Sequence, residues 1–189
     1  MKRNPLSITV GVLLLVIFCL LLFTFQVRQS EVGVVTTFGK PTRTISQPGP
    51  YLKWPWPIQK VYKFDQRIQN FEDDRFDEVL TADNFNLLAM VYMGWRINDP
   101  MAFFTKFANG SITEAEKALR SLIRTAKSAV IGRHPLSDLV SASEAEAKFT
   151  QIESEILQIV QSQVAANNYG IEIEFVGFKK LGLPESVTT

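Results

Sequence analysis

The residue types that carry most enzyme chemistry are sparse in this chain. His134 is the only histidine, Cys19 is the only cysteine, and no Gly-x-Ser-x-Gly, Walker or Gly-x-Gly-x-x-Gly motif occurs. One histidine without partner histidines or cysteines does not make a metal site, and any Ser-His-Asp triad would need His134 as its base. We therefore expect His134 on the surface or at a helix end, and no catalytic site, metal or cofactor. A Ser–Lys dyad stays open, because both residue types are too common for their spacing to exclude it.

A dense group of carboxylates is the second candidate for chemistry. Its members are Glu72, Asp73, Asp74, Asp77 and Glu78. They lack the spacing of a calcium loop, so we interpret them as a solvated face. Of the 20 basic residues, three lie in the first 28 positions, which leaves 17 basic and 19 acidic residues in the remainder. That balance excludes a basic footprint for nucleic acid.

The elements that must position these residues follow a long apolar run. Leu6–Phe25 contains 20 residues and no charge. As a helix it would be about 30 Å long, the thickness of the hydrocarbon core of a bilayer. We predict an uncleaved transmembrane anchor over Leu6–Phe25. The alternatives are a buried soluble helix and a cleaved signal peptide, but a signal h-region has only ~7–15 apolar residues and a small-x-small cleavage site.

The flanking charges predict the orientation of this anchor. Lys2 and Arg3 precede the run, and Arg28 alone follows it closely before Glu31. The positive-inside rule then keeps the N-terminus in the cytoplasm and sends the chain from about residue 28 onward across the membrane. Further basic residues beyond position 39 reduce the charge difference.

After the anchor, the residue pattern indicates a β-rich segment. Strands are expected at 32–38, 59–65, 66–72, 79–81 and 85–97, with turns near Gly39, Gly49 and Asp83. The last of these strands alternates most clearly, since the apolar residues at every second position from Phe85 to Ile97 fall on one face. We predict that it is the core strand of the domain.

The second half of the chain predicts helices. Asp99 followed by Pro100 is a typical helix start, and the helix should run to about Phe107. Possible capping boxes at 111–116 and 143–146 precede two longer apolar stripes of helical period. Gly170 should end the second long helix, and 171–181 returns to the alternation of a strand.

A segment rich in tryptophan and proline stands out between the expected strands. Because proline cannot donate to a central sheet, this segment should be an edge or a loop. Its tryptophans could lie in the headgroup layer of a membrane or cover the end of a small sheet. We expect a membrane-interface set of Tyr51, Trp54, Pro55, Trp56 and Pro57.

Several motifs together resemble the SPFH/band 7 family, which takes in stomatins, prohibitins, flotillins and the bacterial HflK and HflC types. The resemblance is carried by VGVVTTFGKP, by PGPYLKWPWPIQKVYKFDQRIQNFE and by VLTADNFNLLAMVYMGWRINDP, with YGIEIEF and LGLPESV near the C-terminus. The anchor together with FGKP, KWPWP, FDQR and WRINDP is most similar to the HflC-type protease modulators.

The resemblance implies an α/β (α+β) fold. The anchor and cytoplasmic tip (1–28) would be followed by a β-rich SPFH1 subdomain (29–98), an α/β SPFH2 subdomain (99–182) and the start of a coiled-coil helix (183–189). The long helix of the family should begin near Pro184, so we expect a chain truncated at the start of that helix.

The resemblance also implies a non-enzymatic scaffold in the bacterial inner membrane, with the SPFH domain on the extracytoplasmic side. Its expected partners are membrane lipid, an HflK-like paralogue and an FtsH-like membrane AAA protease, in a homo- or hetero-oligomeric ring or cage. Three alternatives stay open: a stomatin-like cytoplasmic scaffold acting on channels or lipid domains, an anchored adaptor of an export system, and a membrane-tethered hydrolase.

Overall fold

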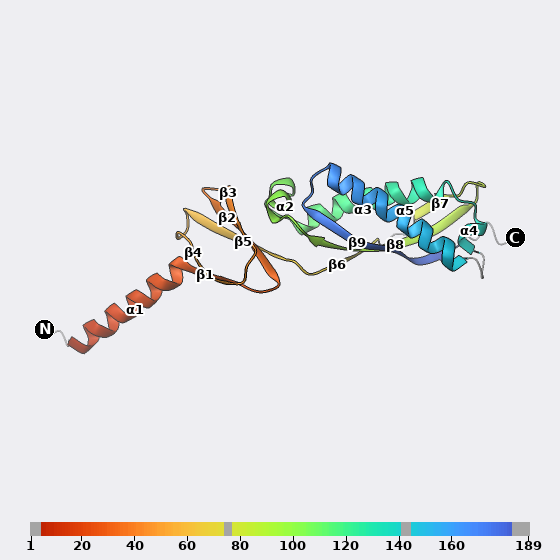
Figure 1. Cartoon of the computed structure of the whole chain (residues 1–189). Helices are drawn as coiled ribbons and strands as arrows, with labels where there is room; N and C mark the ends of the chain where they lie inside the picture. Colours follow the sequence, from red (N-terminus) through yellow and green to blue (C-terminus); the bar gives the residue numbers. More distant parts are fainter. Residues whose placement is uncertain (1–4, 74–76, 141–144, 183–189) are drawn as a thin grey trace. The chain divides into compact units, whose positions relative to one another are not determined.

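The computed structural model describes residues 5–73, 77–140 and 145–182 (Figure 1). The chain divides into two compact units, residues 1–66 and residues 67–189, which we call unit 1 and unit 2.

Unit 1 combines the apolar helix with two small antiparallel sheets. Helix α1 (Pro5–Phe23) leads at once into β1 (Thr24–Val27), which pairs with β4 (Gly49–Leu52). Strand β2 (Glu31–Thr37) lies between β3 (Lys40–Ile45) and β5 (Gln59–Asp65). Its valines favour a strand because β-branched side chains pack well on a pleated surface. The core of unit 1 contains buried Val27, Val35 and Ile45, against which Phe25, Tyr51 and Val61 pack.

The sheet of unit 2 is built around one long strand, β8 (Asn86–Ile97). Strand β9 (Ile171–Gly182) pairs with β8 over most of its length, while β6 (Gln69–Glu72) and β7 (Asp77–Leu80) share its opposite edge. The predicted core strand is confirmed, because its alternate apolar side chains from Leu87 to Ile97 are buried. Phe85 lies just before the strand and is exposed.

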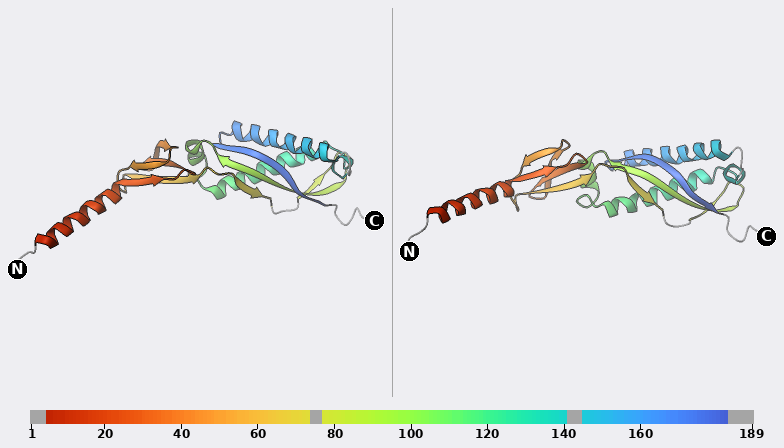
Figure 2. Two further views of the ribbon diagram at one scale, coloured as in Figure 1. Left: turned by 60° about the horizontal axis from the view of Figure 1, so that its bottom comes forward. Right: turned by 90° about the horizontal axis from the view of Figure 1, so that it is seen from below.

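Two long helices cover this sheet on one side, and Figures 1 and 2 show them next to each other along β8 and β9. Helix α3 (Ile112–Ile131) begins at Ser111, whose hydroxyl accepts from the N–H of Glu114. Helix α5 (Ala145–Ala166) packs against α3 and β9.

Two short helices complete unit 2. Helix α2 (Pro100–Lys106) begins as the sequence predicts, since the carboxylate of Asp99 accepts from the N–H groups of Met101 and Ala102. The second short helix, α4 (Ser137–Val140), was not expected from the sequence and follows α3 within a few residues.

The two compact units divide after Gln66, because β8 pairs with β6, β7 and β9 inside unit 2. The expected boundary between an SPFH1 and an SPFH2 subdomain at residue 98 stays a prediction. The apolar helix ends at Phe23, so Phe25, predicted as the last residue of the anchor, lies in β1 opposite Tyr51.

Among the described residues, we find no helix with both the length and the hydropathy that crossing a bilayer demands. The predicted start of a coiled-coil helix at 183–189 and the first two positions of the capping box at 143–146 lie outside the described residues.

Candidate functional site

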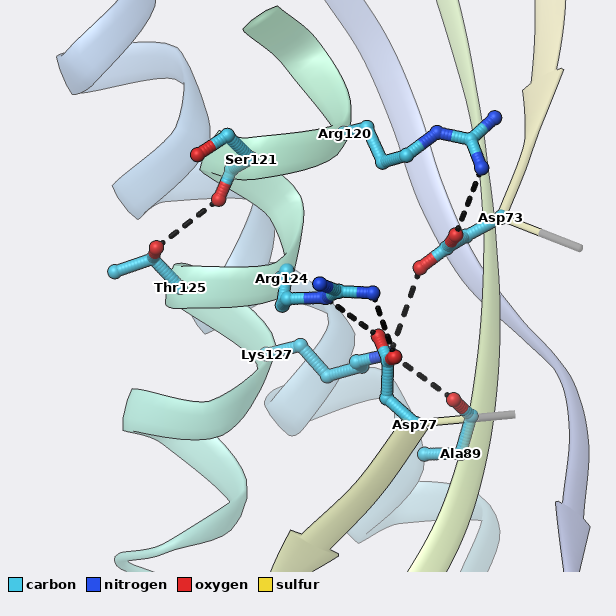
Figure 3. A network of polar contacts seen from close by, with 8 residues as sticks. All are labelled: Asp73, Asp77, Ala89, Arg120, Ser121, Arg124, Thr125 and Lys127. Atoms are coloured by element: carbon cyan, nitrogen blue, oxygen red, sulfur yellow. Dashed lines mark hydrogen bonds and ion pairs between the residues drawn. The ribbon is translucent and has the colours of Figure 1, made fainter. Parts of the chain in front are cut away.

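A network of five charged side chains joins α3 to β7 and β8 (Figure 3). At its centre is Lys127, whose side chain is 0% exposed. Its Nζ donates to Oδ2 of Asp77 and to the carbonyl oxygen of Ala89, both at 3.0 Å. Because a buried ammonium group must keep its hydrogen bonds, these contacts fix α3 against two strands.

Arginines on the same face of α3 complete the network. Arg124 holds Asp77 with two hydrogen bonds of 3.0 and 2.8 Å. Arg120 Nη1 lies 3.6 Å from Oδ1 of Asp73, and Lys127 Nζ lies 3.7 Å from the other oxygen of the same carboxylate. The Asp73 side chain is fully buried and faces these two cations.

The electrostatics of the network favour its charged form. Burial acts to raise the pKa of Asp77, but the hydrogen bonds from Arg124 and Lys127 and their positive charges lower that pKa overall. The pKa of Arg124 is raised, chiefly by its hydrogen bond to Asp77. Each cation therefore has a carboxylate partner, and the network holds α3 against the sheet of unit 2.

The interpretation of residues 72–78 as a solvated face is wrong for Asp73 and Asp77. Glu78 is exposed as expected, and Glu72 forms an ion pair with Lys179 of β9. Asp74 lies outside the described residues. Within the described ranges, no group of three or more acidic, histidine or cysteine side chains is placed to hold a metal ion.

His134 lies at a helix end, as the sequence predicts, just beyond the last residue of α3. Its Nδ1 is 3.4 Å from Oδ2 of Asp138, and its Nε2 is 3.5 Å from Oε2 of Glu155. The pKa of Asp138 is lowered, first by a hydrogen bond from Lys148 and then by His134, while burial opposes the shift. The imidazole thus lies between a carboxylate of α4 and a carboxylate of α5.

One end of unit 1 gathers aromatic side chains around the last residue of α1. The N–H of Phe38 donates to the carbonyl of Ile58 at 2.9 Å, and the N–H of Lys53 donates to the carbonyl of Phe23 at 2.8 Å. The Trp54 ring meets the Phe23 ring edge to face, with centroids 6.3 Å apart. We call this region, formed by Phe23, Phe38 and residues 52–58, the aromatic end.

The large apolar side chains at the aromatic end face outward. Phe38 is 77% exposed, Trp54 59% and Trp56 80%. Adjacent exposed aromatic side chains are typical of an interaction surface, and tryptophan favours the membrane headgroup layer. Pro57 is exposed too, while Tyr51 and Pro55 are half-buried. Membrane contact by this set stays a prediction.

Charge is divided unevenly between the two units. Unit 1 contains eight of the 20 basic residues but only two of the 19 acidic ones, Glu31 and Asp65, so its net charge is +6. Unit 2 contains the other 12 basic and 17 acidic residues, so its net charge is −5. The near-neutral total charge of the chain is therefore the sum of a basic unit 1 and an acidic unit 2.

The spacing of basic residues in the sequence already indicates the charged network. Arg120, Arg124 and Lys127 are spaced four and three residues apart, so they share one face of α3. That face adjoins the stripe of Leu119, Ile123 and Ala126, all fully buried. Basic residues beside a buried stripe indicate internal carboxylate partners, but the identity of those partners follows only from the sheet.

The fold is mixed α/β: unit 1 combines an apolar helix with two small antiparallel sheets, and unit 2 packs two long helices on a third sheet. A family model described as the SPFH domain / Band 7 family matches residues 25–189. The chain therefore belongs to the SPFH/band 7 family, in agreement with the resemblance inferred from its motifs.

Individual relatives are similar over most of this chain. The protein named HflC from Buchnera aphidicola subsp. Acyrthosiphon pisum is 26% identical over 87% of this chain and 56% of its own length. Escherichia coli K12 has a protein named modulator of FtsH protease HflC, 29% identical over 71% of this chain and 41% of its own length. The Vibrio cholerae protein HflC is 24% identical over 93% of this chain and 62% of its own length. The chain thus spans about half the length of these curated relatives.

Proposed function

We propose that this chain is a non-enzymatic membrane scaffold of the HflC type that assembles into a ring or cage and modulates a membrane protease of the FtsH type. The observation that carries the proposal is similarity to proteins named HflC over 71–93% of this chain, one of them named a modulator of FtsH protease. The buried charged network supports a structural role for unit 2, because its cations and carboxylates join elements of the fold.

Attachment to the inner membrane is part of this proposal. Since no described helix is both long and apolar enough to cross a bilayer, the proposal rests on the uncharged sequence Leu6–Phe25 and on the exposed apolar side chains of α1. The aromatic end, which contains Trp54, Pro55, Trp56 and Pro57, would meet the headgroup layer next to the end of this segment, together with the neighbouring Tyr51.

A charge placed inside the apolar segment tests attachment. Leu14→Arg should move the chain from the alkaline-washed membrane fraction to the soluble fraction, because arginine at the centre of a membrane segment costs about 2.5–3.5 kcal/mol. Leu14→Ala is the matched control and should remain with the membrane. Recovery of Leu14→Arg in the washed membranes at the control level would contradict attachment through α1.

The role as a protease modulator is tested in bacteria that contain an FtsH-type protease and lack their own HflC. A tagged chain should purify with the protease and with an HflK-like protein after solubilisation in mild detergent, and it should change the lifetime of a membrane substrate of the protease. Unchanged substrate lifetime together with no co-purification would refute this function even if membrane attachment were confirmed.

A second candidate is a stomatin-like scaffold on the cytoplasmic side that organises lipid domains or regulates channels. The charge of unit 1 favours it, because residues 28–66 contain six basic and two acidic residues and the positive-inside rule disfavours moving such a segment across the membrane. A phosphatase fused after Thr189 should be active if the domain is extracytoplasmic, whereas a fluorescent fusion should be bright if it is cytoplasmic.

A further inference from the structure

A pocket of about 570 Å³ opens at the aromatic end of unit 1. Its lining combines apolar and polar side chains, including Phe23, Leu52, Trp54, Thr37, Arg43 and Lys53. They come from the end of α1, from β2, β3 and β4, and from the segment after β4. The pocket therefore lies where the apolar helix ends and the basic sheets begin.

We infer that this pocket binds an anionic phospholipid, with Arg43 and Lys53 holding its phosphate and the apolar lining holding the upper part of its acyl chains. The inference rests on the proposed membrane attachment and deepens it by assigning a lipid class and a site. Pockets with an apolar lining and a few placed polar groups are typical of sites for ligands that combine both characters.

Arg43 is positioned for phosphate recognition. One of its guanidinium nitrogens, Nη2, donates to the carbonyl oxygen of Leu52 at 2.7 Å, which holds the side chain at the pocket. A guanidinium carries five N–H donors in a planar fork that matches a phosphate, so one intramolecular bond leaves donors for a ligand. The hydroxyl of Thr37, within the same lining, adds a smaller polar group.

Lys53 places a second charge at the same site. Its backbone N–H donates to the carbonyl of Phe23, so the residue is fixed at the end of α1. In the described part of unit 1 the ion pairs of Glu31 are with Arg28 and Lys63. No described carboxylate forms an ion pair with Arg43 or Lys53, so their charges are available to an anionic ligand.

The apolar lining identifies a lipid as the occupant. Phe23 is the last residue of α1, and Trp54 contacts it, so the pocket is continuous with the apolar surface of the helix. Residues 24–66, which follow α1, contain six basic and two acidic residues, and this positive balance complements an anionic headgroup. A free phosphate ion would use the basic groups and leave Leu52 and Trp54 unused.

Trp54 allows a direct test in vesicles of phosphatidylcholine mixed with phosphatidylglycerol. In a Trp56→Phe chain, Trp54 reports on the pocket, and Trp95, buried in unit 2, gives a constant background. Bromine on an acyl chain quenches tryptophan fluorescence on contact. Two sets of vesicles with the same lipid composition are compared, one with brominated phosphatidylglycerol and one with an equal amount of brominated phosphatidylcholine. Brominated phosphatidylglycerol should quench Trp54 more than brominated phosphatidylcholine does.

Two double variants test whether the preference for phosphatidylglycerol over phosphatidylcholine arises at the pocket. Arg43→Gln with Lys53→Gln should remove it, weakening phosphatidylglycerol binding on the order of tenfold. Lys40→Gln with Lys60→Gln removes the same charge from exposed residues of unit 1 outside the pocket lining and should keep the preference. Equal quenching by the two lipids in the Trp56→Phe chain, or equal losses in both double variants, would overturn the assignment.

Two further outcomes separate the possible failures. A chain that does not sediment with the vesicles would refute membrane attachment itself, and the lipid site with it. If excess inorganic phosphate abolishes the difference between the two brominated lipids, the pocket is a site for a free anion and the assignment to a lipid is wrong. We expect the difference to persist in phosphate, because the acyl chains contribute to binding.

Discussion

Lys127 and Asp77 form a 3.0 Å ion pair in which the lysine side chain is fully buried, although the two residues are 50 positions apart in the chain. The pair connects α3 to β7, and Arg124 holds the same carboxylate from the solvent side. Buried pairs are costly to form but more costly to break, because the remaining charge keeps its desolvation penalty. The stability of unit 2 should therefore depend strongly on this one ammonium group.

Lys127→Met should destabilise unit 2 by about 3 kcal/mol, near the lower end of the range for a broken buried pair because Arg124 still holds Asp77. Urea unfolding can be followed by Trp95 fluorescence in a chain with Trp54 and Trp56 changed to Phe. Lys117→Met on the same helix removes an exposed pair with Glu114 and should cost at most about 0.5 kcal/mol. Equal effects of the two changes would contradict a special role for the buried pair.

Acid should weaken unit 2 through Asp77. The folded-state pKa of this carboxyl lies below its ordinary value, so its contribution to stability is fully present above about pH 4. That contribution is lost as the pH falls through the lower folded-state pKa. Asp77→Asn should make the melting temperature less dependent on pH below 4, even though the variant is less stable at neutral pH. Glu78→Gln, at an exposed neighbour, should retain the pH dependence of the original chain.

Replacing Gly170 should lower the stability of unit 2 for two reasons, its positive φ and the close approach of α2. Its φ is +68°, and a Cβ there would lie 2.6 Å from the backbone nitrogen of Phe103 in α2. Gly39 also has a positive φ, of +83°, but a Cβ there would meet nothing within 4 Å. Gly39→Ala should therefore cost about 1 kcal/mol for backbone strain alone.

Gly170→Ala should cost clearly more than Gly39→Ala, by about 1–3 kcal/mol for the added overpacking. The N–H groups of Asn98 and Asp99 both donate to the carbonyl of Gly170, so the start of α2 would be displaced as well. Chemical denaturation of the two variants measures the difference. Equal losses would show that α2 moves aside freely.

The residue pattern predicts the secondary structure of unit 2 better than that of unit 1. In β8 the alternation from Leu87 to Ile97 is uninterrupted, and α2 and α3 have side-chain caps, so local physics determines these elements. Strands β1, β3 and β4 are short or contain proline, which weakens the local signal for a strand. Their pairing is fixed by partners elsewhere in the chain, such as Phe25 opposite Tyr51.

In the candidate sites, too, local sequence predicts positions along the chain but not contacts between residues that are distant in the sequence. The helix-end position of His134 follows from Pro135 after an apolar stripe, and the sequence predicts it correctly. The burial of Asp73 cannot be predicted in this way, because its cationic neighbours Arg120 and Lys127 are more than 40 residues away in the chain. The pocket beside Phe23 likewise depends on side chains from four strands, β2, β3, β4 and β5, near the end of α1.

The tryptophans provide the last prediction, since they separate surface from core within one chain. Trp54 and Trp56 are mostly exposed, whereas Trp95 is 0% exposed and stacks near Phe103, with ring centroids 6.4 Å apart. Changing Trp54 and Trp56 together to Ser should weaken vesicle binding and leave the melting temperature nearly unchanged. Trp95→Ser should instead destabilise unit 2 by about 3–5 kcal/mol, as for other buried aromatic residues. A large loss of stability in the Trp54 and Trp56 variant would show that the pair covers the end of the sheet instead of meeting lipid.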